Sequence, residues 1–390
     1  MGINAILPDQ VLANGASDGD LLTVQADGSV AFETPAAAGI SGSTGSVDNA
    51  VLRADGTGGS TLQSADWIMP DNYTASPNAT VNVCALEATG ATTNVAVAIV
   101  PKGTGAFMLS VPDGTATGGN ARGANAIDLQ AYRTAANQVA SGQASTVVGN
   151  RCRASSTQSL AIGSSVSGTG DYATGIGANS TAAAYAVAVG YDLTAGSTAV
   201  AIGAQSSSTG YAAVMLGNGS AASGWASMAT GFVAVADRVG MRAHSHDRFS
   251  ASGDSLRVDF GIYAKTTDAT PKTMLLGQSY NTTARLTIPS GKILHATVHV
   301  IGSKSDGSGV SVYQRQVAIK NVSGTTSLVG SVNTIGSDTE YYDPVTFAST
   351  SLSVTADDTN DALKIDVTGI ASETWRWFAS VTGVQMAYGT

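Results

Sequence analysis

The chain has 390 residues, a net charge of −9 at pH 7, 46 glycines and only 12% charged residues. This composition is poor in the Glu and Lys of exposed helices, which argues against an ordinary globular enzyme and favours short strands joined by tight turns. No cluster of Lys and Arg could neutralise a run of phosphates, so a nucleic-acid partner is not expected.

The sequence begins with one apolar segment, Ile3 to Val11, which Gly- and Asp-rich turns follow. Leu21–Val24 and Val30–Phe32 flank an Asp-Gly pair, a pattern that predicts a β-hairpin. Residues 37–65 are rich in Gly, Ser and Thr, and we expect them to be a flexible linker or a strand held by partner chains. The start of the sequence lacks the basic and apolar regions of a secretory signal.

Apolar content rises between residues 67 and 112. Strands are predicted at 80–86, 95–100 and 106–109, and a short helix is predicted at 126–135. Cys84 and Cys152 lie in different segments and form no CxxC pattern, so we interpret them as lone thiols.

A glycine recurs every 13 or 14 residues through the middle of the chain. The column comprises Gly149, Gly163, Gly177, Gly190, Gly203, Gly217 and Gly231. A unit this short cannot form a helix pair or a propeller blade, so each must be one coil of a solenoid whose neighbours complete its core. The sequence therefore predicts a parallel β-roll over residues 142–236.

Side chains alternate in size on the strand before each glycine. The residues one and three positions earlier are mostly large and apolar, such as Leu160 and Ile162, whereas the residue four positions earlier is Ala or Ser. We interpret the large face as the filling of the coil and the small face as a surface for close approach. Because a thin roll with two apolar faces is poorly stable alone, the pattern predicts oligomerisation around a shared axis.

The last 150 residues lack this repeat, and their pattern predicts an antiparallel β domain. Strands are predicted at 255–264, 284–289, 293–301, 309–319, 351–355, 361–368 and 374–388. Their spacing indicates a β-sandwich or jelly roll.

Two families share these patterns. The repeated phrase, as in Ala199-Val200-Ala201-Ile202-Gly203, resembles the head repeats of trimeric autotransporter adhesins, which form left-handed parallel β-rolls in a three-chain bundle. Segments 41–56, 100–106 and 118–123 resemble the shaft regions of bacteriophage tail fibres, and segments 249–255, 355–358 and 375–377 resemble a terminal β domain of such fibres. Together the similarities touch most of the chain beyond residue 40.

The resemblance implies an all-β homotrimeric phage tail fibre, located on the virion and extracellular, in which two further copies of the chain are the first partners. It assigns residues 1–40 to virion attachment through tail or adaptor proteins, 41–141 to a shaft, 142–236 to the roll and 237–390 to a receptor-binding domain. The expected receptor is bacterial surface polysaccharide or lipopolysaccharide, bound without catalysis. A tailspike depolymerase and a capsid-attached fibre are the alternatives.

Few side chains suggest chemistry. His244 and His246 would point to one side of a strand, so three chains could hold a metal ion on their axis; otherwise the segment is a polar connector. No other cofactor is expected, and no catalytic residues stand out. Trp375 and Trp377 share a strand face, where exposure would suit stacking on a receptor sugar and burial, the favoured interpretation, would anchor the core.

Two further features have more than one interpretation. An aromatic group near the turns of the roll either covers the coil edges or forms a receptor surface; it comprises Tyr172, Tyr185, Tyr191, Tyr211 and Trp225. The acidic segment 357–361 lacks the Gly and distal Glu of an EF-hand loop and is interpreted as a hairpin turn.

Overall fold

The computed structural model describes residues 94, 96–277, 283–342 and 350–388, together with the backbone of five strands nearer the N-terminus. It divides into two units, Met1–Val100 and Pro101–Thr390. The described residues contain strands and turns without a helix, as the composition predicts. Accordingly, none of them forms a helix long and apolar enough to cross a membrane.

The described strands of the first unit form two small antiparallel sheets. Its strands are β1 (Leu21–Val24), β2 (Val30–Glu33), β3 (Ala50–Asp55), β4 (Thr61–Ile68) and β5 (Glu87–Ala88). The pairing of β1 with β2 confirms the predicted hairpin. The expectation for residues 37–65 was wrong in part, because β3 pairs with β4 of the same chain. Residues 96–100 form no strand, and the strand predicted at 80–86 lies outside the described residues.

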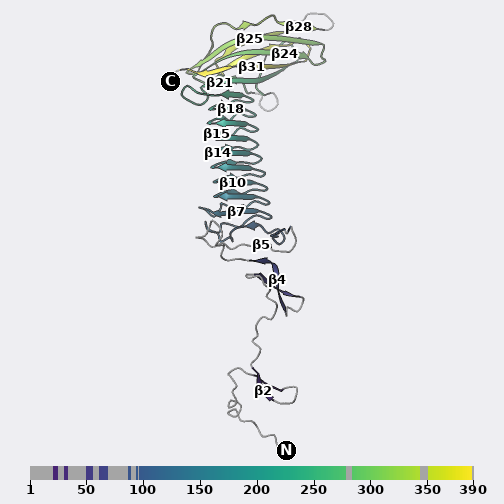
Figure 1. Ribbon diagram of the computed structural model, residues 1–390. Coiled ribbons are helices and arrows are strands. Elements are labelled where there is room, and N and C mark those ends of the chain that lie inside the picture. Colours follow the sequence, from purple (N-terminus) through teal and green to yellow (C-terminus); the bar gives the residue numbers. More distant parts are fainter. Residues whose placement is uncertain are drawn as a thin grey trace, which may run out of the picture. The chain divides into compact units, whose positions relative to one another are not determined.

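A parallel β-solenoid forms the first part of the second unit, with coils stacked in register (Figure 1). One side of the coils is made of β6 (Phe107–Met108), β7 (Ile127–Tyr132), β8 (Thr146–Asn150), β10 (Leu160–Ser164), β12 (Thr174–Ala178), β14 (Val187–Ala195), β15 (Val200–Ser208), β16 (Val214–Asn218), β18 (Met228–Phe232) and β20 (Arg242–Ser245). The opposite side is made of β9 (Arg153–Ala154), β11 (Ser167–Gly168), β13 (Thr181–Ala182), β17 (Ala221–Ala222), β19 (Val235–Ala236) and the second halves of β14 and β15.

The ladder begins before and ends after the predicted limits of 142 and 236. It already includes β7, which pairs in parallel with β8, so the helix predicted at 126–135 was wrong. The alternating burial of Asp128 and Gln130 along β7 is strand-like. At the other end β20 pairs in parallel with β18, so one further coil extends to Ser245.

The glycine column explains how each coil bends. Gly203 has φ +132°, and a Cβ built there would lie 1.8 Å from the carbonyl oxygen of Gly217 in the next coil. The column members stack directly on one another, as Gly190 on Gly203 and Gly203 on Gly217. Only glycine tolerates both this backbone conformation and so close an approach.

The interior of the roll reverses the predicted placement of large and small side chains. Ala and Ser side chains such as Ala186, Ala188 and Ala201 are fully buried, whereas Ile202 and Leu216 are 41% and 37% exposed. The reason is the thinness of the coil: a Cβ at Gly175 would lie 2.5 Å from Cγ1 of Val166. Small residues therefore fill the coil, and the large apolar residues point outward.

A buried charge cluster closes the N-terminal end of the roll. Asp128 accepts from Arg122 Nε at 2.6 Å and from Arg133 Nη2 at 3.2 Å, and all three side chains are fully buried. The guanidinium groups also donate to backbone carbonyls, including those of Gly118 and Gln138. Terminal coils of solenoids need such a polar cap, because no further coil covers them.

The described residues after β20 form two antiparallel sheets. The larger contains β21 (Ser255–Thr266), β24 (Lys292–Lys304), β25 (Gly309–Val322), β26 (Thr325–Leu328), β27 (Asn333–Thr334), β28 (Thr339–Tyr342) and β31 (Trp375–Ala387). The smaller contains β22 (Lys272–Thr273), β23 (Leu286–Thr287), β29 (Ser351–Asp357) and β30 (Ala362–Thr368). Each of the seven predicted segments overlaps one of these strands, and the turn between β29 and β30 confirms the hairpin expected at 357–361.

The order of the larger sheet is β21–β31–β24–β25, with β26, β27 and β28 all pairing with β25. Side chains from both sheets, such as Phe260, Val298 and Ile365, belong to one buried cluster. This shared core makes the region one layered β domain, the terminal domain. Its jelly-roll topology stays a prediction.

Candidate functional site

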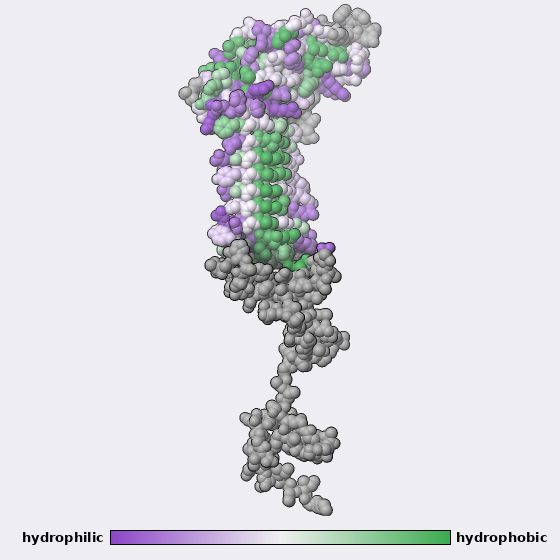
Figure 2. Space-filling model, in the orientation of Figure 1, coloured by the Kyte–Doolittle hydropathy of each residue, from purple (hydrophilic) through white to green (hydrophobic). Residues whose placement is uncertain are grey.

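An apolar stripe runs along the outside of the roll, on the side that carries the glycine column (Figure 2). It consists of Val148, Leu160, Ile162, Ile176, Val187, Val189, Val200, Ile202, Val214, Leu216 and Met228. Each residue sits above its counterpart in the preceding coil, as Leu216 above Ile202 and Ile202 above Val189. The parallel register thus converts a repeated phrase into one continuous surface, which is the kind of surface that marks an association site.

The stripe ends at the last coil, where polar residues take its two columns. Arg242 follows Met228 and His244 follows Thr230. β20 then pairs with β21 in antiparallel fashion, with Arg242 opposite Asp259. The outward face of the roll therefore continues without a break onto the larger sheet of the terminal domain.

A buried arginine holds the roll to this domain. Arg238 donates to the carbonyl of Thr287 at 2.9 Å and to Gln385 Oε1 at 2.6 Å, and its guanidinium lies 4.9 Å from the ring centre of Phe260. Burial lowers the pKa of Arg238 from its ordinary value, and neighbouring Asp237 opposes that change. These contacts fix the direction in which the domain leaves the roll.

Replacing Arg238 with Met is expected to lower the free energy of unfolding by about 2 to 3 kcal/mol. The change keeps the apolar stem but removes two hydrogen bonds of a charged group and leaves the Gln385 amide without its donor. Urea denaturation measures the effect. The same change at exposed Arg248 is the control, and equal losses at both positions would contradict the proposed anchor.

Asp254 fastens the loop between β20 and β21. Its carboxylate accepts from the backbone N–H groups of Phe249, Ser250 and Ala251 at 2.6 to 3.0 Å. Burial raises the pKa of Asp254, but these three donors and the charge of Lys292 outweigh it, so the pKa lies below the ordinary value of 3.8.

Because this pKa is lowered on folding, the stabilisation from Asp254 is complete above about pH 4 and is lost as the pH falls through the folded value. We expect Asp254→Asn to lower the melting temperature at pH 7 and to shrink the difference in melting temperature between pH 7 and pH 3. Calorimetry at both values tests this. An undiminished difference in the variant would contradict it.

The two candidate metal ligands do not form a complete site within one chain. His244 is exposed, and its Nδ1 lies 3.0 Å from Thr230 Oγ1. His246 is also exposed and follows the end of β20. Among the described residues no three His, Cys, Asp or Glu side chains gather to hold a metal ion. The shared metal between chains stays a prediction.

The candidate receptor tryptophans are core residues. Trp375 and Trp377 are 1% and 2% exposed, and their rings stack with centroids 5.7 Å apart. Their indole N–H groups donate to Glu373 and to Thr266. Burial, the favoured interpretation of these two residues, is therefore confirmed, and the alternative of receptor contact was wrong, because the inward face of β31 carries them, while Phe378 lies on the outward face.

Aromatic residues do line one edge of the roll. Tyr172 stacks on Tyr185 with centroids 5.3 Å apart, and Tyr211 stacks on Trp225 at 6.5 Å. All four are more than a third exposed, so they do not serve as buried covers of the coils. Cys152, by contrast, is buried, and burial raises the pKa of its thiol; Cys84 lies outside the described residues.

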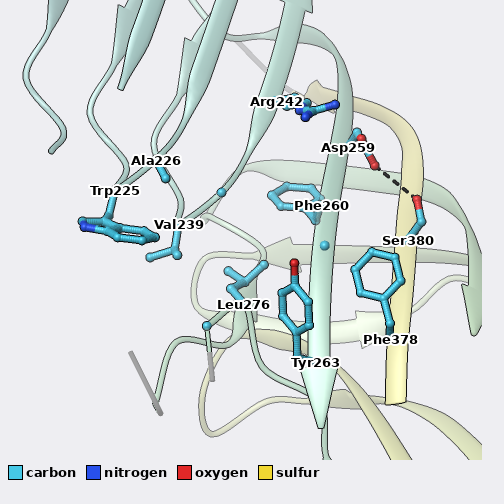
Figure 3. Close-up of a pocket in the computed structure, with 13 residues that line it drawn as sticks. Trp225, Ala226, Val239, Arg242, Asp259, Phe260, Tyr263, Leu276, Phe378 and Ser380 are labelled. Carbon is cyan, nitrogen blue, oxygen red and sulfur yellow. Dashed lines mark hydrogen bonds between the residues drawn. The ribbon is translucent and has the colours of Figure 1, made fainter. Parts of the chain in front are cut away.

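A cavity of about 640 Å³, here called the junction pocket, opens where the last coils meet the terminal domain (Figure 3). Trp225 and Val239 form its roll side, and Tyr263 and Phe378 face them from β21 and β31. Asp259 lies at one end, where its Oδ1 accepts from Ser380 Oγ at 3.3 Å. The volume is in the range of small-molecule sites, about 300–1,000 Å³.

The fold defines the class of this protein: an all-β chain with a parallel β-solenoid and a layered antiparallel domain. No family model and no curated protein matches the sequence.

Among solved structures, the chain is similar to the tailspike protein of Acinetobacter phage vB_ApiP_P1, with 10% identity, a TM-score of 0.17, and coverage of 62% of this chain and 53% of the other. It is also similar to the tailspike gp49 of Acinetobacter baumannii bacteriophage Fri1, a capsular polysaccharide depolymerase, with 9% identity and a TM-score of 0.22. The match covers 71% of this chain and 52% of the other. A third neighbour is the tailspike of Acinetobacter baumannii phage AM24, with 9% identity and a TM-score of 0.20. The match covers 66% of this chain and 60% of the other. The chain spans little more than half the length of these proteins, and similarity at this level establishes neither a common fold nor a common activity.

Proposed function

We propose that the protein is a homotrimeric phage tail fibre that attaches the virion to a bacterial surface, with the roll as a stiff spacer and the terminal domain in contact with surface glycans. The apolar stripe carries the proposal. A stripe of large apolar side chains along one side of successive coils is unfavourable in water, and a closed ring of identical chains would cover it in all copies at once.

The order of the segments supports the direction of the fibre. Segments that resemble fibre shafts precede the roll, and segments that resemble a fibre-terminal domain follow it. The N-terminal part would then join tail or adaptor proteins and the terminal domain would face the host. Three copies of one weak glycan site would bind a repetitive polysaccharide by avidity.

Binding without cleavage is part of the proposal. A glycosidase needs a carboxylic acid whose pKa is raised so that it can protonate the leaving group. In the described chain, hydrogen bonds lower the pKa values of three aspartates. The main donor is the backbone N–H of Thr115 for Asp113 and the backbone N–H of Thr270 for Asp268. For Asp306 the main donor is the hydroxyl group of Ser308. These groups are thus suited to loop structure and unsuited to general acid catalysis.

The test uses the purified full-length protein on an array of bacterial capsular polysaccharides and lipopolysaccharides. We expect retention of at least one polysaccharide, without release of oligosaccharides after prolonged incubation. Sustained release of oligosaccharides would contradict binding without cleavage and would favour the alternative function, a tailspike depolymerase. Labelling of the N-terminus on intact particles distinguishes tail from capsid attachment.

A further inference from the structure

We propose that the junction pocket binds a neutral pyranose unit of a bacterial surface glycan. The inference rests on the proposed function for the source of the glycan, but the site follows from the pocket itself. Its lining combines aromatic faces with the carboxylate of Asp259, an acceptor, and the guanidinium of Arg242, a donor, which is the chemistry that recognises a sugar ring.

The aromatic part of the pocket comes from three separate elements. Trp225 belongs to a turn of the roll, Tyr263 to β21 and Phe378 to β31, and the last two rings lie with centroids 5.1 Å apart. The three side chains are 37%, 41% and 42% exposed. Aromatic rings that served only the core would be buried, as Trp375 is, whereas rings held on opposite sides of an open cavity suit the apolar C–H faces of a pyranose.

The polar part is a carboxylate beside a guanidinium. Arg242 and Asp259 are direct partners on paired strands, yet no ion pair joins them in the described chain. Ser380 and Thr382 donate to Oδ1 of Asp259, at 3.3 and 3.2 Å, which orients the carboxylate, and no described residue donates to its Oδ2. One acceptor and one donor side by side match vicinal hydroxyl groups, and their opposite charges favour a neutral sugar over an acidic one.

The aromatic surface continues beyond the pocket along the roll. Trp225 stacks on Tyr211 of the preceding coil with an angle of 7° between the rings. Tyr211 is itself 57% exposed. A glycan seated in the junction pocket would therefore run down this edge and contact Tyr211 with its next unit, so we expect oligosaccharides to bind more tightly than monosaccharides.

Gly240 offers a way to block the pocket without removing a contact. It lines the cavity with φ +63°, and a Cβ there meets nothing within 4 Å. The same position in earlier coils is occupied by Ala226 and, further down, Gln158, both with positive φ. A glutamine at position 240 is therefore compatible with the roll and would project into the cavity.

The experiment measures binding of the full-length protein to the polysaccharide array described above. Trp225→Ala, Asp259→Asn and Gly240→Gln are expected to weaken binding at least tenfold, whereas the control Tyr172→Ala, which removes an exposed aromatic ring far along the same edge, leaves binding unchanged. Native mass and circular dichroism are recorded for every variant.

Each outcome separates the site from the function. If the wild-type protein binds a polysaccharide and all three pocket variants bind it equally well, the pocket is not the site but attachment stands. If the wild-type protein binds no polysaccharide, both the pocket site and the proposed attachment function fail. If Trp225→Ala or Gly240→Gln changes the native mass, a second copy of the chain covers the pocket, and the sugar site is overturned.

Discussion

Replacing Ile202 and Leu216 together with aspartate is expected to reduce the native mass from about 117 kDa, three times the 38.9 kDa of one chain, to that of the monomer. Both side chains are more than a third exposed in the single chain and lie in neighbouring coils of the apolar stripe. Aspartates there stay solvated in one chain but would be desolvated and close to like charges where three stripes meet.

Light scattering of the native protein measures the mass, and circular dichroism shows whether the coils persist. Thr181→Asp with Thr194→Asp is the matched control, since these exposed residues lie in neighbouring coils on the opposite side of the roll. A control variant that also dissociates, or a stripe variant that keeps the wild-type mass, would refute the stripe as the interface. A monomeric wild-type protein would exclude the trimer itself.

The second large effect is expected at the glycine column. Gly203→Ala places a methyl group 1.8 Å from the Gly217 oxygen at a backbone angle that L residues rarely adopt. Because the neighbouring coil cannot move away without breaking its ladder, we expect a loss of more than about 4 kcal/mol in the free energy of unfolding.

Gly240→Ala provides the comparison in the same fold. It shares the positive φ but has no atom within 4 Å of the added methyl, so its cost should be about 1 kcal/mol. Denaturant titration of both variants separates steric contact from backbone strain. Similar losses for the two variants would mean that the contact between successive glycines does not determine stability.

The architecture of the roll was readable from sequence, but the direction of its side chains was not. The glycine spacing predicts the coil, and β10 pairs with β12 and β14 with β15 as that spacing requires. Which face points inward depends on the distance between the two sides of the coil. That distance admits Ala188 and excludes Ile202, and no local pattern reports it.

The wrong helix at 126–135 has a related cause. Its Ala, Leu and Gln residues suit a helix locally, but tertiary pairing with β8 and burial of Asp128 against two arginines favour a strand. Arg122 lies in a segment noted for its fibre resemblance, yet nothing in the sequence shows that its partner is Asp128.

The junction pocket was beyond sequence reasoning for the same reason. Trp225 stood out as one of several aromatics near turns, and Tyr263 and Phe378 did not stand out at all. They meet because β20 pairs with β21 and β21 with β31. In β31, successive side chains alternate between the two faces, so Trp377 is buried and Phe378 is exposed. Which of these aromatic rings reaches the surface depends on which face of β31 the smaller sheet covers.

By itself the sequence determined the repeat, its register and the all-β character of the protein, since these follow from glycine spacing and alternation along the chain. Only the tertiary structure decided that small residues fill the roll, that large ones form an outward apolar stripe, and that the junction pocket exists. Those properties depend on distances between coils and sheets, which chain-local patterns do not encode.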